Sequence, residues 1–241
     1  MGRTFENRKI TMLKRSDRDA KAFSRAGRQI SMAVKAAGPD PDANPQLRRA
    51  MQNARSVNMP KDRIKAAIDK AMGVGGGADY QEIIYEGYGP HGVPVMVVTA
   101  TDNPTRTVAN VRSAFNKGGG NMGNSGCVAF MFEQMGVFQL DPEGVDREEL
   151  ELELIDHGLE QLDDGKSDKG DDVLILRCAR DEFGNLNAAL EERKLEVKSS
   201  GFEWIPNTTT SLGDDETDEV LAMVVRLEDD DDVQAVFHNL E

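Results

Sequence analysis

The sequence predicts an α+β protein in which an N-terminal helical bundle is followed by two ferredoxin-like α/β domains, the third domain inserted in the second. Apolar residues recur at helical spacing through the first third of the chain. Strand-like and helix-like segments then alternate, and glycines at positions 73 and 75–77 separate the two parts. The predicted domains comprise residues 1–78, residues 79–133 with 208–241, and residues 134–207.

Three helices are expected in the N-terminal third. The first runs from a capping box at Ser16 to Ala37, where glycine and proline stop it. Its apolar residues fall on one face and its cations on the opposite face. Two further helices, at residues 44–57 and 60–72, are joined by a break of two residues. So short a break favours two helices of a bundle over a helix-turn-helix.

The remainder alternates between strands and helices. Strands are expected at residues 80–88, 93–101, 127–132, 137–140, 159–162, 173–178, 196–205 and 233–238, and helices at 106–117, 147–157, 181–193 and 216–227. Residues 137–205 then have the order β-α-β-β-α-β, which is ferredoxin-like. The flanking segments supply a second α+β unit that the first one interrupts.

Charge is distributed unevenly along the chain. The net charge of −14 combines +10 in residues 1–72 with −24 in the rest. A basic third on an acidic chain favours binding of an anion, and a phosphate backbone is the obvious one. The sequence leaves a second interpretation open, in which the basic helix face docks on the acidic body of the same chain.

The candidate contact residues are the cations of the first helix and its approach, with a few beyond it. Their predicted role is to neutralise phosphates, which positions a protein without reading sequence. The candidates are Arg8, Lys9, Lys14, Arg15, Arg18, Lys21, Arg25, Arg28 and Lys35, with Arg48, Arg49, Lys61 and Lys117 as weaker members.

Other chemistry finds little support. The glycine runs follow helices, whereas a phosphate loop precedes one. The histidines and the two cysteines show no metal-ligand spacing, and both cysteines are expected to be buried thiols. The five acids at 228–232 are interpreted as a solvated turn. We therefore expect no enzymatic activity, cofactor or metal. The loop at 117–124 is interpreted as mobile, either a contact loop or a connector.

No apolar run approaches the ~18–20 residues that cross a bilayer, and the first 30 residues show no apolar signal segment. A cytoplasmic protein without membrane contact is the expectation.

Several segments resemble the YebC family, which includes PmpR-like transcriptional regulators and a mitochondrial translational activator. The resemblance covers nearly the whole chain, and its motifs lie at residues 38–48, 58–62, 85–93, 101–107, 111–112, 117–121, 126–132 and 231–239. It implies the three domains given above and a non-enzymatic regulator of gene expression in the cytoplasm. The family is commonly described as DNA-binding, although some members act on ribosomes.

These inferences together predict a non-enzymatic regulator that binds DNA or ribosomal RNA, with the ribosome as a candidate partner. A protein-interaction adaptor that uses the acidic α/β domains is the alternative. The oligomeric state is left open.

Overall fold

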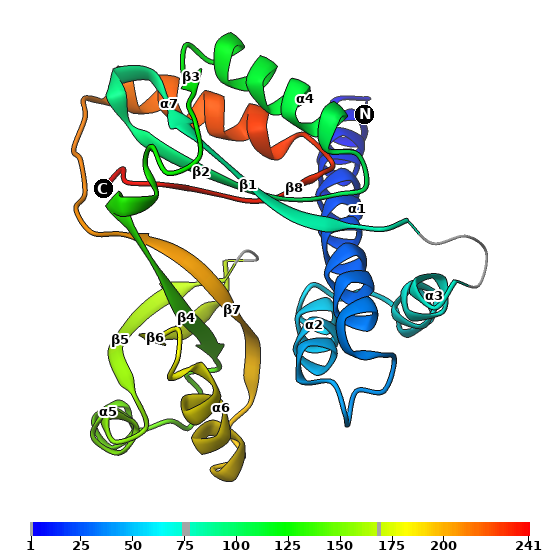
Figure 1. Cartoon of the computed structure of the whole chain (residues 1–241), viewed down its shortest axis with the longest axis vertical. Coiled ribbons are helices and arrows are strands. Elements are labelled where there is room, and N and C mark those ends of the chain that lie inside the picture. Colours follow the sequence, from blue (N-terminus) through cyan, green and yellow to red (C-terminus); the bar gives the residue numbers. More distant parts are fainter. Residues whose placement is uncertain (1, 74–77, 168–169) are drawn as a thin grey trace. The chain divides into compact units, whose positions relative to one another are not determined.

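The computed structural model describes residues 2–73, 78–167 and 170–241, with side chains from residue 18 onward. The α+β prediction is confirmed: helices dominate the N-terminal third, and two four-stranded sheets follow (Figure 1). The chain divides into two compact units. The first unit comprises Met1–Ile84, Val97–Ala114 and Val224–Val236, and the second comprises Tyr85–Met96, Phe115–Met223 and Phe237–Glu241. The three predicted domains stay a prediction, and the predicted linker at 75–77 lies outside the described residues.

The N-terminal helices are α1 (Gly2–Ala37), α2 (Pro45–Ser56) and α3 (Lys61–Ala71). Helix α1 begins at Gly2, so the predicted helix start at Ser16 is wrong. One face of α1 packs against both α2 and α3. The buried core of this bundle consists of Ala26, Ile30, Ala33, Val34, Leu47, Ala50, Ala54, Met59 and Ile64.

The buried side chain of Asn44 ties α2 to the end of α1. Its Oδ1 accepts from the amide of Leu47 at 3.0 Å, and its Nδ2 donates to the carbonyls of Ala33 and Gly38 at 2.8 Å each. This N-cap leaves none of the side chain's polar atoms without a partner. Four residues connect α2 to α3, where the sequence predicted two. Asn58 among them has a φ of 63°, in the left-handed region that Gly often fills in such turns.

The first sheet has the strand order β3-β1-β2-β8. Its strands are β1 (Gln81–Tyr88), β2 (Pro94–Thr101), β3 (Asn121–Met122) and β8 (Val233–His238). Helices α4 (Pro104–Lys117) and α7 (Asp214–Glu228) cover one face of it (Figure 1). The burial of all but one residue in β2 explains its unbroken apolar run.

The second sheet lies wholly within the second unit. Its strands are β4 (Phe132–Leu140), β5 (Leu159–Lys166), β6 (Asp172–Ala179) and β7 (Val197–Pro206), with helices α5 (Arg147–Ile155) and α6 (Phe183–Glu192) between them. Their order is β5-β6-β4-β7, and every neighbouring pair is antiparallel. This is the ferredoxin-like arrangement that the element order predicted.

The predicted strand at 127–132 is wrong. A 3₁₀ turn, η2 (Ala129–Met131), occupies half of it. The buried carboxylate of Glu86 accepts from the amides of Gly126, Val128 and Ala129, at 2.7, 2.9 and 2.9 Å. A backbone that wraps three amides around one carboxylate cannot also run straight as a strand.

Strand β5 continues to Lys166, beyond the predicted end at residue 162. Asp163, Asp164 and Gly165 are poor strand formers, and they predicted a loop. They nevertheless pair with Ile175, Leu174 and Val173 of β6. Cross-strand pairing outweighs their local preference.

Candidate nucleic-acid interface

The predicted cations divide into groups with different surroundings. Arg8, Lys9, Lys14 and Arg15 lie on the first half of α1, whose side chains are outside the described part of the chain. Arg18 follows them and is exposed.

The cations further along α1 contact other residues of the first unit. Lys21 Nζ lies 2.5 Å from Asp229 Oδ1, and Lys35 Nζ lies 2.7 Å from Asp79 Oδ1. Arg25 donates to the carbonyls of Glu228 and Val233, each at 3.0 Å. The open alternative from the sequence, a basic helix face docked on acidic residues of the same chain, matches these contacts.

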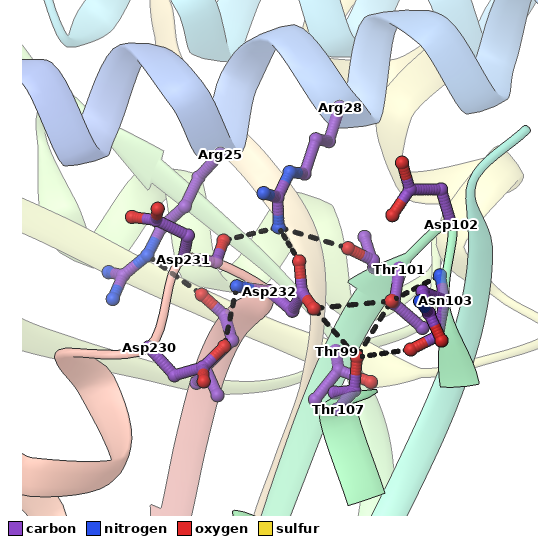
Figure 2. A network of polar contacts seen from close by, with 12 residues as sticks. Arg25, Arg28, Thr99, Thr101, Asp102, Asn103, Thr107, Asp230, Asp231 and Asp232 are labelled. Carbon is purple, nitrogen blue, oxygen red and sulfur yellow. Dashed lines mark hydrogen bonds and ion pairs between the residues drawn. The ribbon is translucent and has the colours of Figure 1, made fainter. Parts of the chain in front are cut away.

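Arg28 is the most enclosed of these cations. It donates to the carbonyls of Ala100, at 3.0 Å, and Asp231, and lies 2.9 Å from Asp232 Oδ1 (Figure 2). Its side chain is 12% exposed and that of Asp232 is 3% exposed. The guanidinium group also lies over the ring of Tyr80, 5.3 Å from its centroid.

Asp232 is the centre of a polar network (Figure 2). Its carboxylate accepts from the hydroxyl groups of Thr107 at 2.6 Å and Thr101 at 3.2 Å. It also pairs with Arg106 of α4 at 2.7 Å and with Arg28 of α1. Two helices and the end of β2 therefore meet at one buried carboxylate, whose lone pairs are well satisfied.

The network sets the protonation state of Asp232. Burial alone would raise the pKa of this carboxyl. The hydrogen bonds from Thr107 and Arg106, together with the positive charges of Arg28 and Arg106, outweigh burial and lower the pKa below its ordinary value. Asp232 thus remains a carboxylate across the neutral range. The hydrogen bonds to Asp232 and Asp102 likewise raise the pKa of Arg106.

Sequence reasoning missed this network. It interpreted residues 228–232 as a solvated turn, which is wrong for Asp232 because the last acid of the run is buried. A signal existed in the Thr-Asp-Asn-Pro-Thr-Arg-Thr segment at 101–107, which places three hydroxyls and an arginine around a helix start. Nothing in the sequence alone showed that residue 232 would lie against that segment.

A cavity of about 380 Å³ lies beside the network. Its lining consists of Arg28, Tyr80, Asp102, Arg106, Asn110, Asp230, Asp231 and Asp232. Both arginines already pair with Asp232, and three further carboxylates surround them, so the cavity does not favour an anion. Among the residues that the structure describes, no group of three or more His, Cys, Asp or Glu side chains could hold a metal ion.

Helices α2 and α3 carry cations of a different kind. Arg55, Lys61, Lys65 and Lys70 are exposed, and none of them forms an ion pair within the described part of the chain; we call these four the open cations. Of the other predicted residues here, Arg48 is exposed and donates to the carbonyl of Pro41 at 3.2 Å. Burial lowers the pKa of Arg49, which is half-buried. The sequence ranked Lys61 below the α1 cations and did not select the other three.

Lys117 ends α4 and is exposed, but the glycines after it are not a mobile loop as predicted. A Cβ at Gly118 would lie 2.3 Å from Cγ of Met223, and one at Gly120 would lie 2.6 Å from the carbonyl oxygen of Tyr88. Strand β3 then pairs with β1 directly after them. These glycines permit close packing inside the second unit.

The two cysteines have different surroundings. Cys178 is fully buried as expected, and burial together with the nearby acids Glu160, Glu182 and Asp181 raises the pKa of its thiol to about 11. Cys127 is half-buried, where full burial was expected, and burial followed by the charge of Glu86 raises its pKa. Neither thiol has the depressed pKa of a nucleophile.

No helix in the described ranges combines the length and the apolar character needed to span a membrane.

Comparison with known proteins gives consistent matches along the chain. Residues 3–74 match a family model described as the TACO1/YebC protein N-terminal domain, and residues 80–240 match one described as the TACO1/YebC second and third domain. A probable transcriptional regulatory protein of Anaeromyxobacter dehalogenans is 57% identical over 240 residues, with both chains covered in full. Another of that description, from Myxococcus xanthus, is 53% identical with the same coverage.

A solved structure is also similar. The crystal structure of a conserved hypothetical protein from Aquifex aeolicus matches with a TM-score of 0.81 and 37% identity, covering 92% of this chain and 90% of that one. At this identity the match supports the whole α+β architecture described above.

Proposed function

This chain belongs to the TACO1/YebC family, and from that premise we propose that it is a regulator of gene expression that binds nucleic acid through phosphate contacts and catalyses no reaction. The relatives carry the description of probable transcriptional regulatory proteins. The observation that supports phosphate binding is the set of open cations on α2 and α3. Exposed cations that no carboxylate neutralises are those that gain most from a phosphate.

The contacts are proposed to be with backbones and not with base edges. Helix α2 has three arginines and no acid, but Arg48 and Arg49 both have partners within the chain. The open cations include one arginine and three lysines, and lysine is a point charge without the planar fork that reads guanine. We therefore expect a preference among DNA sequences well below the ~10³-fold margin typical of specific regulators.

Duplex DNA is the first ligand to test, because the relatives are described as transcriptional regulatory proteins. Ribosomal RNA presents the same phosphates and is the second ligand to test. Cosedimentation with ribosomes at moderate salt, without measurable retention on duplex DNA, would assign the regulator to translation.

The proposal is tested by the salt dependence of binding. On duplex DNA each phosphate contact contributes about 0.9 to the slope of log affinity against log salt. The triple variant Lys61→Gln, Lys65→Gln, Lys70→Gln should lower this slope by between two and three units.

A matched control removes three lysines from the second unit, as Lys166→Gln, Lys194→Gln, Lys198→Gln. It changes the net charge equally and should leave the slope within about half a unit. An equal decrease of the salt slope in both variants would show that the effect depends only on net charge. An unchanged slope in the folded α3 variant would refute the phosphate contacts and favour the protein-interaction adaptor.

A further inference from the structure

Hydrogen bonds and ion pairs join α1 to residues 228–233. They comprise the ion pairs Lys21–Asp229 and Arg28–Asp232 and the hydrogen bonds from Arg25 and Arg28 to backbone carbonyls. The buried apolar residues of α1 belong to the core that it forms with α2 and α3. Salt weakens the exposed Lys21–Asp229 pair, whereas the buried Arg28–Asp232 pair is screened much less.

The acidic turn, residues 228–232, presents oxygen atoms to α1 much as a phosphate backbone would. Two carboxylates and the carbonyls of Glu228 and Asp231 receive the donors of Lys21, Arg25 and Arg28. Both guanidinium groups are thereby occupied. A phosphate has the same charge sign and equally suitable acceptors, so it competes for the same donors.

We propose that this face of α1 is a second phosphate-binding surface, which the acidic turn covers and which duplex DNA uncovers by displacing the turn. The inference rests on the proposed function, since it takes nucleic acid to be the ligand of the open cations. DNA held at α2 and α3 raises the local phosphate concentration beside α1, because the three helices share one core.

The network around Asp232 permits this exchange. If Arg28 leaves, Asp232 still pairs with Arg106 at 2.7 Å and still accepts from Thr107 at 2.6 Å. The buried carboxylate is therefore not left unpaired, which is the outcome that makes breaking a buried ion pair costly. Asp229, the partner of Lys21, is 66% exposed and returns to water at little cost.

The first experiment neutralises the turn without altering the buried network. In the variant Asp229→Asn, Asp231→Asn the two exposed acids lose their charge, while Asp232 and the carbonyl of Asp231 remain. Affinity for a 20-base-pair duplex, measured by fluorescence anisotropy at 50 mM salt, should rise about five-fold.

The matched control is Asp215→Asn, Asp218→Asn, two exposed acids of α7 in the second unit. It changes the net charge by the same amount and should raise affinity less than two-fold. Equal gains in both variants would overturn the inference, because the turn would then act only through net charge.

The second experiment uses the unaltered chain. A carbodiimide joins Lys21 Nζ to the Asp229 carboxyl as an amide with loss of water, and the 2.5 Å separation makes this a favoured zero-length crosslink. Mass spectrometry should show its yield falling at least three-fold as duplex DNA reaches saturation. The Lys198–Asp141 crosslink, across 2.8 Å in the second unit, should stay constant.

The outcomes separate the two proposals. A constant Lys21–Asp229 yield on chain that is saturated with DNA overturns the covered surface and leaves the proposed function standing. Absence of DNA and RNA binding in every variant overturns the proposed function and the covered surface with it.

Discussion

The cations of α1 and those of α3 differ in what faces them. Lys21 and Arg28 meet carboxylates of the same unit, whereas Lys61 and Lys65 face solvent. Both sets lie on polar faces of amphipathic helices, so helical spacing in the sequence does not distinguish one set from the other. Whether a cation stabilises the fold or remains available to a ligand is decided by the tertiary partner, and the partner of α1 lies some 200 residues away.

The largest expected effect is on stability at Arg28. Replacing it by Gln removes an ion pair to Asp232 and the donors to two carbonyls in a site with little solvent. Asp232 keeps its pairs with Arg106 and Thr107, so the loss comes mainly from the carbonyls of Ala100 and Asp231 that are left without a donor. The free energy of unfolding should fall by about 2 kcal/mol. Urea titration followed by circular dichroism measures this. Lys65→Gln, on an exposed helix face, is the control and should stay within ~0.5 kcal/mol of the parent. Equal unfolding free energies for the two variants would show that the α1 cations stabilise the fold no more than the α3 cations do.

The second expected effect is a loss of stability at low pH. The pKa of Asp232 is lower in the folded chain than its ordinary value, so the unfolded chain binds this proton more readily. The resulting stabilisation is fully present above about pH 4 and is lost as the pH falls through the folded pKa. Its size is about 1.4 kcal/mol for each pH unit that separates the pKa of the folded chain from that of the unfolded chain.

The control for this pH dependence is Asp232→Asn, which lacks the titrating group. Its unfolding free energy should depend less on pH below about 4 than that of the parent chain. Parallel curves for the two proteins would show that other carboxylates account for the acid sensitivity.

The sequence predicted much of the fold for identifiable reasons. Helical spacing of Ile30 and Val34 identified the core face of α1, and the element order at 137–205 predicted the ferredoxin-like sheet. These features depend on local periodicity, which can be recognised within a single segment of the sequence. The turn at residues 126–131 was mispredicted because its conformation depends on the distant carboxylate of Glu86.

The candidate site was harder to predict for the same reason. The sequence located the basic third of the chain, but it ranked Arg25 and Arg28 above the lysines of α3. Their guanidinium groups are engaged by the turn after α7, and no local pattern reports that contact. The prediction that Arg25 and Arg28 contact nucleic acid stands as a proposal that now requires displacement of this turn.

A smaller effect on stability is expected at Thr107. Its hydroxyl donates to Asp232 at 2.6 Å in a buried site. Thr107→Val keeps the shape and removes the donor, so the free energy of unfolding should fall by about 1.5 kcal/mol. Thr105→Val, at an exposed position of the same helix, is the control and should change it by less than ~0.5 kcal/mol. Thermal unfolding of both variants measures this difference, and equal values would show that the Thr107 hydroxyl contributes nothing to the stability of the network.

The smallest stability effect is expected at Lys21, where the partners are both exposed. Lys21→Gln removes one surface ion pair and should change the free energy of unfolding by less than ~0.5 kcal/mol.

The effect of Lys21→Gln on DNA binding tests most sharply whether the α1 cations and the α3 cations differ. Because Lys21 must leave Asp229 before it meets a phosphate, Lys21→Gln should weaken binding less than Lys65→Gln, which costs roughly five-fold near 0.1 M salt. In an Asp229→Asn background the cost of Lys21→Gln should rise to that of Lys65→Gln, while the cost of Lys65→Gln stays the same. Identical costs for Lys21→Gln with and without Asp229 would mean that the acidic turn does not compete with DNA, and that α1 contributes to the fold alone.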